Sequence, residues 1–329
     1  MTTVKRDYAS ILFTPEQIGN FGADYLRQRQ EHRNLGIPLY HKILDRDFYP
    51  LLPGELCSII ARPGNGKTGF MMRWARERSN ALRGMNIRDR AVIYITLEQS
   101  IEELNAFNLA ADEHLSITSL AKGEISKEEW ARCLKNAVGR RFLPLWNIGY
   151  SSMTPEKQIR VDIDAIRGAL NLICEDHRMI IDMIFVDYLQ RIPINDRSES
   201  KTVAVSENVD ALKTIALESK CPVVLGVQAR REVEERSEPI PEIQDGQWTS
   251  NIEQTSDRVV SLIRPRLYRE EGKQFGKRAV SGHCQMIVTV LKQKMGRANY
   301  SEWVYFQPEY NKLDALEQEA APVRVPYRE

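Results

Sequence analysis

Residues 61–68 (ARPGNGKT) combine the residue types that bind phosphate. They lie between a short apolar run and a segment with helical character, so the chain is expected to turn there from a buried strand into a helix. Successive backbone N–H groups and the helix dipole at such a turn face an anion. Gly64 and Gly66 let the backbone come close to phosphate, Lys67 supplies a point charge, and the Thr68 hydroxyl can ligate Mg²⁺. A chance glycine-rich turn is the alternative, and the flanking strand and helix argue against it.

This loop predicts ATP as the ligand, together with Mg²⁺. The usual pattern has glycine at its first position, where this chain has Ala61. Nucleotide contacts are expected from Arg62, Pro63, Gly64, Asn65, Gly66, Lys67, Thr68 and Gly69.

Three polar residues follow apolar runs that read as strands. Asp187 is placed to hold Mg²⁺ and its water shell, although acids at strand ends are also common as turn formers. Glu98 could orient and deprotonate the water that attacks the γ-phosphate, or it could be a first-turn acid of the next helix. Gln228 could sense the γ-phosphate and pass its state to the loop that follows, or be an ordinary polar strand end.

Strands alternate with helices from Leu56 onward. The early strands are continuous apolar runs, which is typical of a parallel sheet covered on both faces. The last strands follow one another directly and predict an antiparallel edge. Strands are expected at 56–60, 91–97, 142–148, 183–186, 222–227, 258–263, 286–292 and 303–307. Among the helices, one is expected to begin at Thr154 and to bury Ile159, Ile163, Ile166, Leu170 and Ile173. The next buries Val205, Val209, Leu212 and Ala216.

The chain is expected to divide into three parts. Residues 1–50 form an extension with a polar helix capped by Thr14 and running to about His32. Residues 51–315 form the ATPase domain, and 316–329 a weakly ordered tail. Within the domain, 196–202 and 270–282 are expected to be solvated loops because they lack apolar periodicity.

The composition is that of an ordinary globular protein. The 329 residues are 42% hydrophobic and 28% charged, with a net charge of +1, so a nucleic acid would have to bind through local patches. The longest apolar run, 179–189, is broken by Asp182 and Asp187, which excludes a membrane span, and the absence of a signal-peptide pattern predicts the cytoplasm. Five cysteines without C-x-x-C spacing predict free thiols: Cys57, Cys133, Cys174, Cys221 and Cys284.

A series of short motifs occurs in the order found in one protein family. The chain resembles the RecA-like motor domain of DnaB-type replicative helicases from about Gly36 to Leu313. The motifs are ARPGNGKT at 61–68, TLEQS at 96–100, GEISKEEW at 123–130, LPLWNI at 143–148, DYLQ at 187–190, VQARREVEER at 227–236, SNIEQTSD at 250–257 and KQKMG at 292–296. Their shared order over some 250 residues is far more specific than any one of them.

The resemblance implies roles that agree with those read from the residues. Lys67 and Thr68 match the family's phosphate and metal contacts, Glu98 its catalytic glutamate, Asp187 its Walker B acid and Gln228 its sensor glutamine. Members of the family often have alanine at the position of Ala61.

The family's KQRNG motif supplies a lysine and an arginine finger to the ATP site of the adjacent subunit. The matching positions here are Lys292 and Lys294. An ammonium neutralises charge but lacks the planar fork of arginine, so slower hydrolysis is expected. Arg297 could substitute, or Lys294 could be a simple exposed lysine.

The loop that contacts DNA in the family also differs. Gln247 and Trp248 stand where an Arg-Glu pair is typical, and Trp248 could stack on a base or pack against a neighbouring subunit. Arg230 and Arg231 could follow a phosphate backbone, or belong to a solvated charged face. The first fifty residues are too few for the family's helical collar, so primase coupling by the usual route is in doubt.

The sequence leaves two main classes of function and a third, simpler one. The first is a ring-forming homo-oligomer, a hexamer by resemblance, that moves along single-stranded DNA by hydrolysing ATP. The second is a RecA-like ATPase that assembles with ATP but does not unwind DNA, in recombination, mobile elements, defence or regulation. A nucleotide-binding structural subunit is the third reading, and Lys67, Glu98 and Asp187 argue against it.

Overall fold

A nine-stranded mixed sheet forms the centre of the protein, in the order β11-β10-β9-β6-β1-β5-β4-β2-β3. The computed structural model describes residues 12–31, 36–154, 159–194, 200–247, 251–276, 278–282 and 284–315. Strands β1 to β6 run parallel, whereas β9, β10 and β11 are antiparallel at one edge, which confirms the predicted fold class. The strands are β1 (Leu56–Ala61), β2 (Arg90–Thr96), β3 (Leu145–Ile148), β4 (Ile180–Asp187), β5 (Val223–Gln228), β6 (Arg258–Ile263), β9 (Gln285–Gln293), β10 (Tyr300–Gln307) and β11 (Lys312–Ala315).

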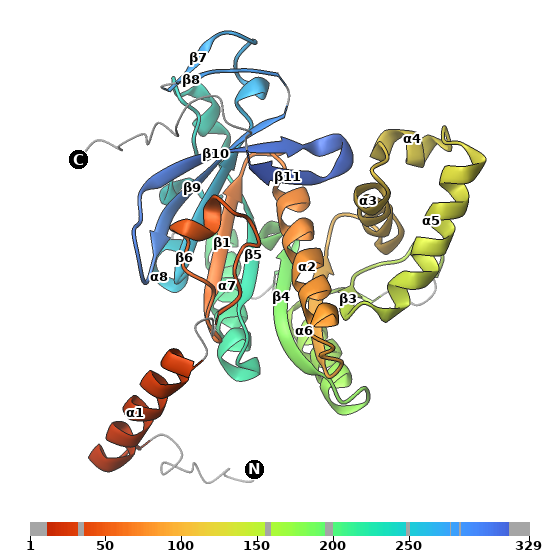
Figure 1. Cartoon of the computed structure of the whole chain (residues 1–329). Coiled ribbons are helices and arrows are strands. Elements are labelled where there is room, and N and C mark those ends of the chain that lie inside the picture. Colours follow the sequence, from red (N-terminus) through yellow and green to blue (C-terminus); the bar gives the residue numbers. More distant parts are fainter. Residues whose placement is uncertain are drawn as a thin grey trace.

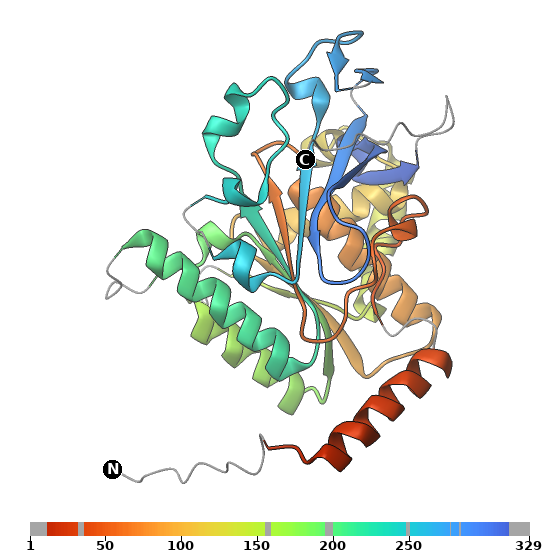
Figure 2. The same ribbon diagram turned by 90° about the vertical axis from the view of Figure 1, so that its left-hand side faces the viewer.

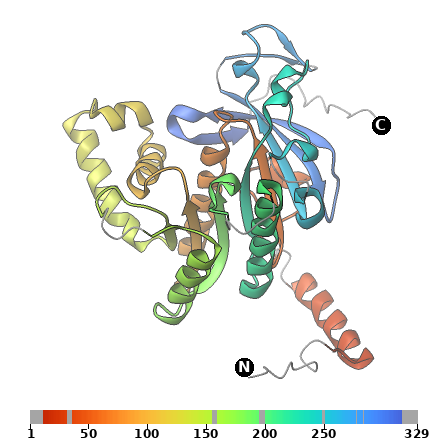
Figure 3. The same ribbon diagram turned by 180° about the vertical axis from the view of Figure 1, so that it is seen from behind.

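Helices cover both faces of this sheet. Helix α2 lies on one face with the lobe of α3, α4 and α5 beside it, and α6 and α7 lie on the other (Figure 1; Figure 2). The view from behind shows α6 and α7 side by side in front of the strands (Figure 3). The helices are α1 (Pro15–Glu31), α2 (Lys67–Gly84), α3 (Ile101–Glu113), α4 (Ile117–Lys122), α5 (Lys127–Gly139), α6 (Ile163–Glu175), α7 (Lys201–Ser219) and α8 (Ile252–Thr255).

The central strands are apolar throughout because each face packs against its own core. In β1, Cys57 and Ile59 belong to the cluster under α2, which also contains Trp74, whereas Leu56 and Ile60 belong to the cluster under α6 and α7. Every residue of β1 is buried. This is the continuous burial expected of a parallel strand between two helical layers.

The segment before β1 is held against α2. The Trp74 indole N–H donates to the carbonyl of Pro38 at 2.7 Å, and the Arg73 guanidinium donates to the carbonyls of Leu39 (3.0 Å) and Tyr40 (2.6 Å). These bonds attach the chain that leads from α1 to the body of the protein.

Helix α1 stands away from the body in all three views (Figure 1; Figure 2; Figure 3). Thr14 caps it as expected, since the Gln17 backbone N–H donates to Thr14 Oγ1 at 3.2 Å. Ile18, Phe21 and Tyr25 leave an apolar stripe exposed, at 60%, 54% and 45%. Such a stripe is typical of a helix that packs against a partner.

The expected start of the helix that contains Ile163 was wrong. Helix α6 begins at Ile163, with Asp162 accepting from the Ala165 N–H at 2.9 Å, rather than at Thr154. Ile159 is 74% exposed and lies outside the helix, so its apparent place in the apolar repeat was fortuitous. The expected start at Thr154 runs into residues 155–158, which lie outside the described residues.

The segment 270–282 is also not simply a solvated loop. It forms the hairpin of β7 (Gln274–Phe275) and β8 (Arg278–Ala279), and Phe275 and Val280 are buried against Trp303. The strand expected at 142–148 is shorter, because residues 140–142 form a 3₁₀ turn. Most of the predicted loop at 196–202 and the whole tail at 316–329 fall outside the described residues.

The five cysteines are free thiols, and burial raises the pKa of the Cys57 thiol to about 12. In the described ranges, no group of His, Cys, Asp or Glu side chains is arranged to hold a metal by itself. None of the helices described is both long and apolar enough to cross a membrane.

Candidate functional site: the phosphate-binding loop and its surroundings

The loop between β1 and α2 has the backbone shape of an anion cradle. Gly64 and Gly66 have φ angles of 77° and 85°, in the left-handed region that favours glycine. A Cβ on Gly66 would lie 2.7 Å from both Met286 and Phe306, so no larger residue fits there without displacement. Gly66 caps α2, whose first residue is Lys67, and therefore directs the helix amino terminus toward the pocket.

Asn65 connects this loop to the segment that follows β6. Its Nδ2 donates to Tyr268 Oη at 2.8 Å, and its Oδ1 accepts from the Arg264 backbone N–H at 2.8 Å. The side chain is 1% exposed and does not line the pocket. Asn65 therefore joins the loop to the segment after β6, and its position suits support of the loop rather than contact with phosphate.

Asn65→Ala is predicted to destabilise the fold by about 1–3 kcal/mol, because the N–H of Arg264 and the hydroxyl of Tyr268 lose a partner. The loop should also lose its shape, so KM for ATP should rise. Urea unfolding and steady-state ATP hydrolysis measure the two effects. Asn80→Ala, within α2 and away from the loop, is the control, and equal behaviour of the two variants would refute the anchoring role.

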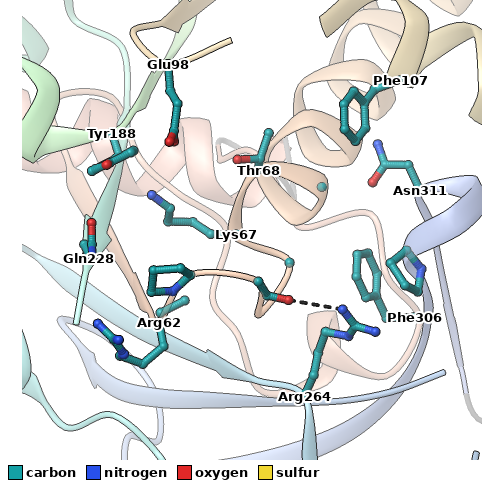
Figure 4. A pocket seen from close by; sticks show the side chains of 16 residues that line it. Arg62, Lys67, Thr68, Glu98, Phe107, Tyr188, Gln228, Arg264, Phe306 and Asn311 are labelled. Atoms are coloured by element: carbon teal, nitrogen blue, oxygen red, sulfur yellow. Dashed lines mark hydrogen bonds between the residues drawn. The ribbon is translucent and has the colours of Figure 1, made fainter. Parts of the chain in front are cut away.

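A pocket of about 320 Å³ opens over the loop (Figure 4). It brings together side chains from separate parts of the sequence, which meet at the carboxyl ends of the parallel strands. This edge of an open α/β sheet is where ligands bind. The lining residues are Ala61, Arg62, Pro63, Gly64, Gly66, Lys67, Thr68, Gly69, Glu98, Phe107, Tyr188, Gln228, Arg264, Phe306, Pro308 and Asn311.

Lys67 lines this pocket, and its side chain is 12% exposed. Its Nζ lies 3.3 Å from Asp187 Oδ1 and 3.8 Å from the centre of the Tyr188 ring. Burial lowers the pKa of Lys67, and the charges of Asp187 and Glu98 oppose that shift. The ammonium is thus held by one carboxylate and one ring in a place where a phosphate would be a stronger partner.

Asp187 ends β4, and its two oxygens have different surroundings: Oδ1 faces the ammonium of Lys67, whereas Oδ2 faces Tyr94. Its Oδ2 accepts from Tyr94 Oη at 3.0 Å, whereas the buried Oδ1 makes no hydrogen bond within the described part of the chain. Thr68 directs its hydroxyl into the neighbouring space between Lys67 and Glu98 (Figure 4). Carboxylate and hydroxyl oxygens are ligands suited to Mg²⁺, so these residues fit that ion.

Glu98 reaches into the pocket from the end of β2 and faces Lys67 across it (Figure 4). Its side chain is 52% exposed and lies 3.6 Å from the guanidinium of Arg191. The helix after it is capped by Ser100, in a capping box with Glu103. Glu98 is therefore not needed as a helix cap, which argues against that reading of its position.

Gln228 lines the same pocket from the end of β5. The Arg62 guanidinium, in contrast, donates to Glu234 Oε1 at 2.8 Å and to the carbonyl of Ala229 at 3.0 Å. Arg62 thus borders the pocket while its charge is engaged at the strand end.

The sequence profile of the DnaB-like helicase C-terminal domain matches residues 36–315. The chain belongs to this family. The replicative DNA helicase DnaB of Rickettsia typhi is 31% identical over 68% of this chain and 44% of its own length. That of Geobacillus stearothermophilus is 28% identical over 88% of this chain and 59% of its own length. The chain thus spans about half the length of the curated relatives that it matches.

Solved structures share the fold of this DnaB-like domain. One of them, an isolated ATPase domain, superimposes with a TM-score of 0.76 at 20% identity, covering 93% of this chain and all of that one. A DnaB-like replicative helicase, described together with its interactions with primase, gives a TM-score of 0.73 at 20% identity over 91% of this chain and 66% of its own. For this chain, the doubt about primase coupling stays a prediction.

The sequence did not predict several of the residues that line the pocket. Tyr188 and Arg264 lie within two residues of the end of an expected strand, and that position could have identified them. Phe306 and Asn311 come from the antiparallel edge, where no sequence pattern indicates proximity to the loop.

The Arg264 guanidinium donates to the carbonyl of Gly64 at 3.1 Å (Figure 4). A guanidinium and an aromatic ring beside the phosphate cradle are groups on which a base can stack.

Lys292 and Lys294 of the DnaB-like domain lie away from this pocket. In the sheet, Lys292 pairs with Val259 at the start of β6, and its Nζ donates to the carbonyl of Glu253. Lys294 lies 3.8 Å from Asp257, just before β6. Both are therefore at the amino-terminal end of the parallel strands, opposite to the phosphate-binding loop.

The residues expected to contact DNA lie beyond the end of β5. Arg230 and Arg231 are exposed, whereas the neighbouring Arg236 is held by both oxygens of Asp245 at 2.7 Å. Gln247 donates its backbone N–H to the carbonyl of Gln228 at 2.9 Å. Trp248 lies outside the described residues.

Proposed function

We propose that this chain is the ATP-hydrolysing, ring-forming motor of a DnaB-type helicase, which moves along or unwinds DNA by gripping single strands. The observation that carries the proposal is that the predicted ATP-site residues lie in two separate places. Lys67, Glu98 and Gln228 converge on one pocket, whereas Lys292 and Lys294 lie at the opposite end of the sheet. A complete site then requires a second copy of the chain.

The residues of one protomer suffice to bind and orient ATP. The loop N–H groups and Lys67 hold the β- and γ-phosphates, and Glu98 accepts the proton of the water that attacks the γ-phosphorus as the bond to ADP breaks. Thr68 and Asp187 would hold Mg²⁺, which would supply positive charge to the phosphate oxygens. Glu98 must leave Arg191 to act, and this separation is easy because an exposed ion pair contributes little free energy.

The neighbouring protomer supplies the remaining positive charge. Lys294, with Lys292, approaches the γ-phosphate from across the subunit boundary and neutralises charge that develops during transfer. A single ammonium offers no bidentate contact, so hydrolysis is slower than with an arginine at this position.

Assembly of the ring is supported by two exposed apolar surfaces. One is the stripe of α1, and the other is on α5, where Trp130, Leu134 and Val138 recur every four residues at 41%, 62% and 60% exposure. We propose that α1 of one protomer packs on α5 of the next, because Ile18 and Phe21 on α1 and these three residues on α5 are all exposed apolar side chains.

Phe21→Asp is therefore expected to shift the protein from a ring to smaller species, since a charge would be buried in the apolar contact. Light scattering coupled to size-exclusion chromatography measures the mass. Ala23→Asp adds the same charge to the opposite face of α1 and should leave assembly intact. A full-size ring with Phe21→Asp would exclude this docking.

Strand displacement from forked DNA tests the function itself. The motor hypothesis predicts ATP-dependent displacement and ATP hydrolysis that is stimulated by single-stranded DNA. The second candidate, a RecA-like ATPase that assembles without unwinding, is favoured by Lys294 at the finger position and by Gln247 and Trp248 in the DNA loop. ATP-dependent assembly without DNA stimulation or displacement would establish that second function and reject the first.

A further inference from the structure

The side chain of Gln190 joins two elements that the proposed function requires to move together. Its Oε1 accepts from the backbone N–H of Gln228 at 3.0 Å, and its Nε2 donates to the carbonyl of Gln247 at 3.0 Å. Gln228 and Gln247 are joined to each other as well, by the N–H of Gln247 and the carbonyl of Gln228 at 2.9 Å. One amide group thus bridges the end of β5 to the segment that leads into residues 248–250.

Gln190 also lies close to the catalytic end of the site. It belongs to a short 3₁₀ turn, Leu189–Arg191, which begins two residues after Asp187. The next residue, Arg191, forms the ion pair with Glu98. A displacement of this turn therefore acts on Gln228 and Gln247 through the two hydrogen bonds of Gln190, and it also moves Arg191, which Glu98 must leave to act.

Both hydrogen bonds of the bridge depend on the orientation of one side chain. Both polar ends of the Gln190 amide are satisfied, and rotating the side chain breaks both bonds at once. A satisfied network of this kind moves as a unit or comes apart, because a half-paired polar group is unfavourable. These are the properties of an element that can couple two sites.

We propose that Gln190 is a positioning residue that transmits the nucleotide state sensed at Gln228 to the segment beginning at Gln247, and DNA occupancy of that segment back to the ATP site. The inference rests on the proposed function for its DNA end. Coupling between binding sites is reciprocal, so one bridge serves both directions. A residue that only braced the fold would affect all nucleotide states equally.

Hydrogen–deuterium exchange of the peptide around Gln247 tests the bridge without DNA. In the wild-type protein, replacing ADP by saturating adenylyl imidodiphosphate should change exchange of this peptide about fivefold or more. Gln190→Ala should abolish that difference. Gln190→Glu should abolish it too, because a carboxylate still accepts from the Gln228 N–H but cannot donate to the Gln247 carbonyl. Gln244→Ala, an exposed glutamine nearby whose side chain donates to Glu242, is the matched control and should keep it.

A second measurement reports on the DNA end. The ratio of ATP hydrolysis with and without single-stranded DNA should fall toward one in Gln190→Ala and stay at the wild-type value in Gln244→Ala. A wild-type protein without DNA stimulation would contradict the proposed function, yet the exchange difference would still decide the role of Gln190. Retention of the full exchange difference in Gln190→Ala or Gln190→Glu, or its absence from the wild type, would overturn the inference.

Discussion

Glu98→Gln is expected to keep ATP binding and to lower ATP turnover by about 10²–10⁴-fold. Glutamine has the shape of glutamate but cannot accept the proton of the attacking water. The change is local because the side chain is half exposed and its partner, Arg191, is separated from it by 3.6 Å. Binding of a fluorescent ATP analogue and steady-state phosphate release measure the two properties separately.

Glu102→Gln provides the matched control for that variant. Glu102 lies four residues further on, in the first turn of α3, and its carboxylate is bound by Ser151 and Ser152. It does not line the pocket, so its replacement should leave turnover within about twofold of wild type. Wild-type turnover in Glu98→Gln would remove Glu98 from the mechanism.

Much of the fold was predictable because its strands are buried on both faces. The apolar runs at β1, β2, β5 and β6 matched the observed strands to within about one residue at each end. The phosphate-binding loop was predictable for a similar reason, since its chemistry is local in sequence. Asp187, Glu98 and Gln228 each follow a strand, and parallel topology brings such ends to one edge.

The remaining features depend on contacts between distant parts of the chain. Phe306 reaches the loop only because β10 and β9 extend the sheet beyond β6, and no pattern around it indicates this. The anchoring of Asn65 by Tyr268 likewise joins segments 203 residues apart. The hairpin at 274–279 was missed because, among the described residues of this segment, Phe275 and Val280 alone are buried, which is too little to give a periodic signal.

The start of α6 was predicted at the wrong residue because the sequence before it resembles a helix start. Ile159 continues the helical spacing of the apolar residues that follow, and the Thr154-Pro155-Glu156 sequence looks like a helix start. The actual cap is Asp162, whose side chain accepts from the backbone N–H three residues later. Asp162 is itself a residue type that caps helices, and it could have indicated the correct start.

Recovery of activity in mixed rings is the second large effect that we expect. Lys67→Ala removes the phosphate contact and Lys294→Ala removes the finger, so each variant alone should be nearly inactive. In a ring, a subunit with an intact Lys67 can face a neighbour with an intact Lys294. At each boundary one subunit contributes the phosphate-binding loop and the other contributes Lys294. With equal amounts and random assembly, each contribution is intact at about half of the boundaries, so both are intact at about a quarter.

Single-turnover ATP hydrolysis in these mixtures tests the shared site most directly, because it counts competent sites without requiring them to act in sequence. We expect clear hydrolysis when Lys67→Ala is mixed with Lys294→Ala, and none when Lys294→Ala is mixed with the Lys67→Ala/Lys294→Ala double variant. Mixtures that co-assemble yet show only the sum of the separate activities at every ratio would contradict it, and would place the whole ATP site within one chain.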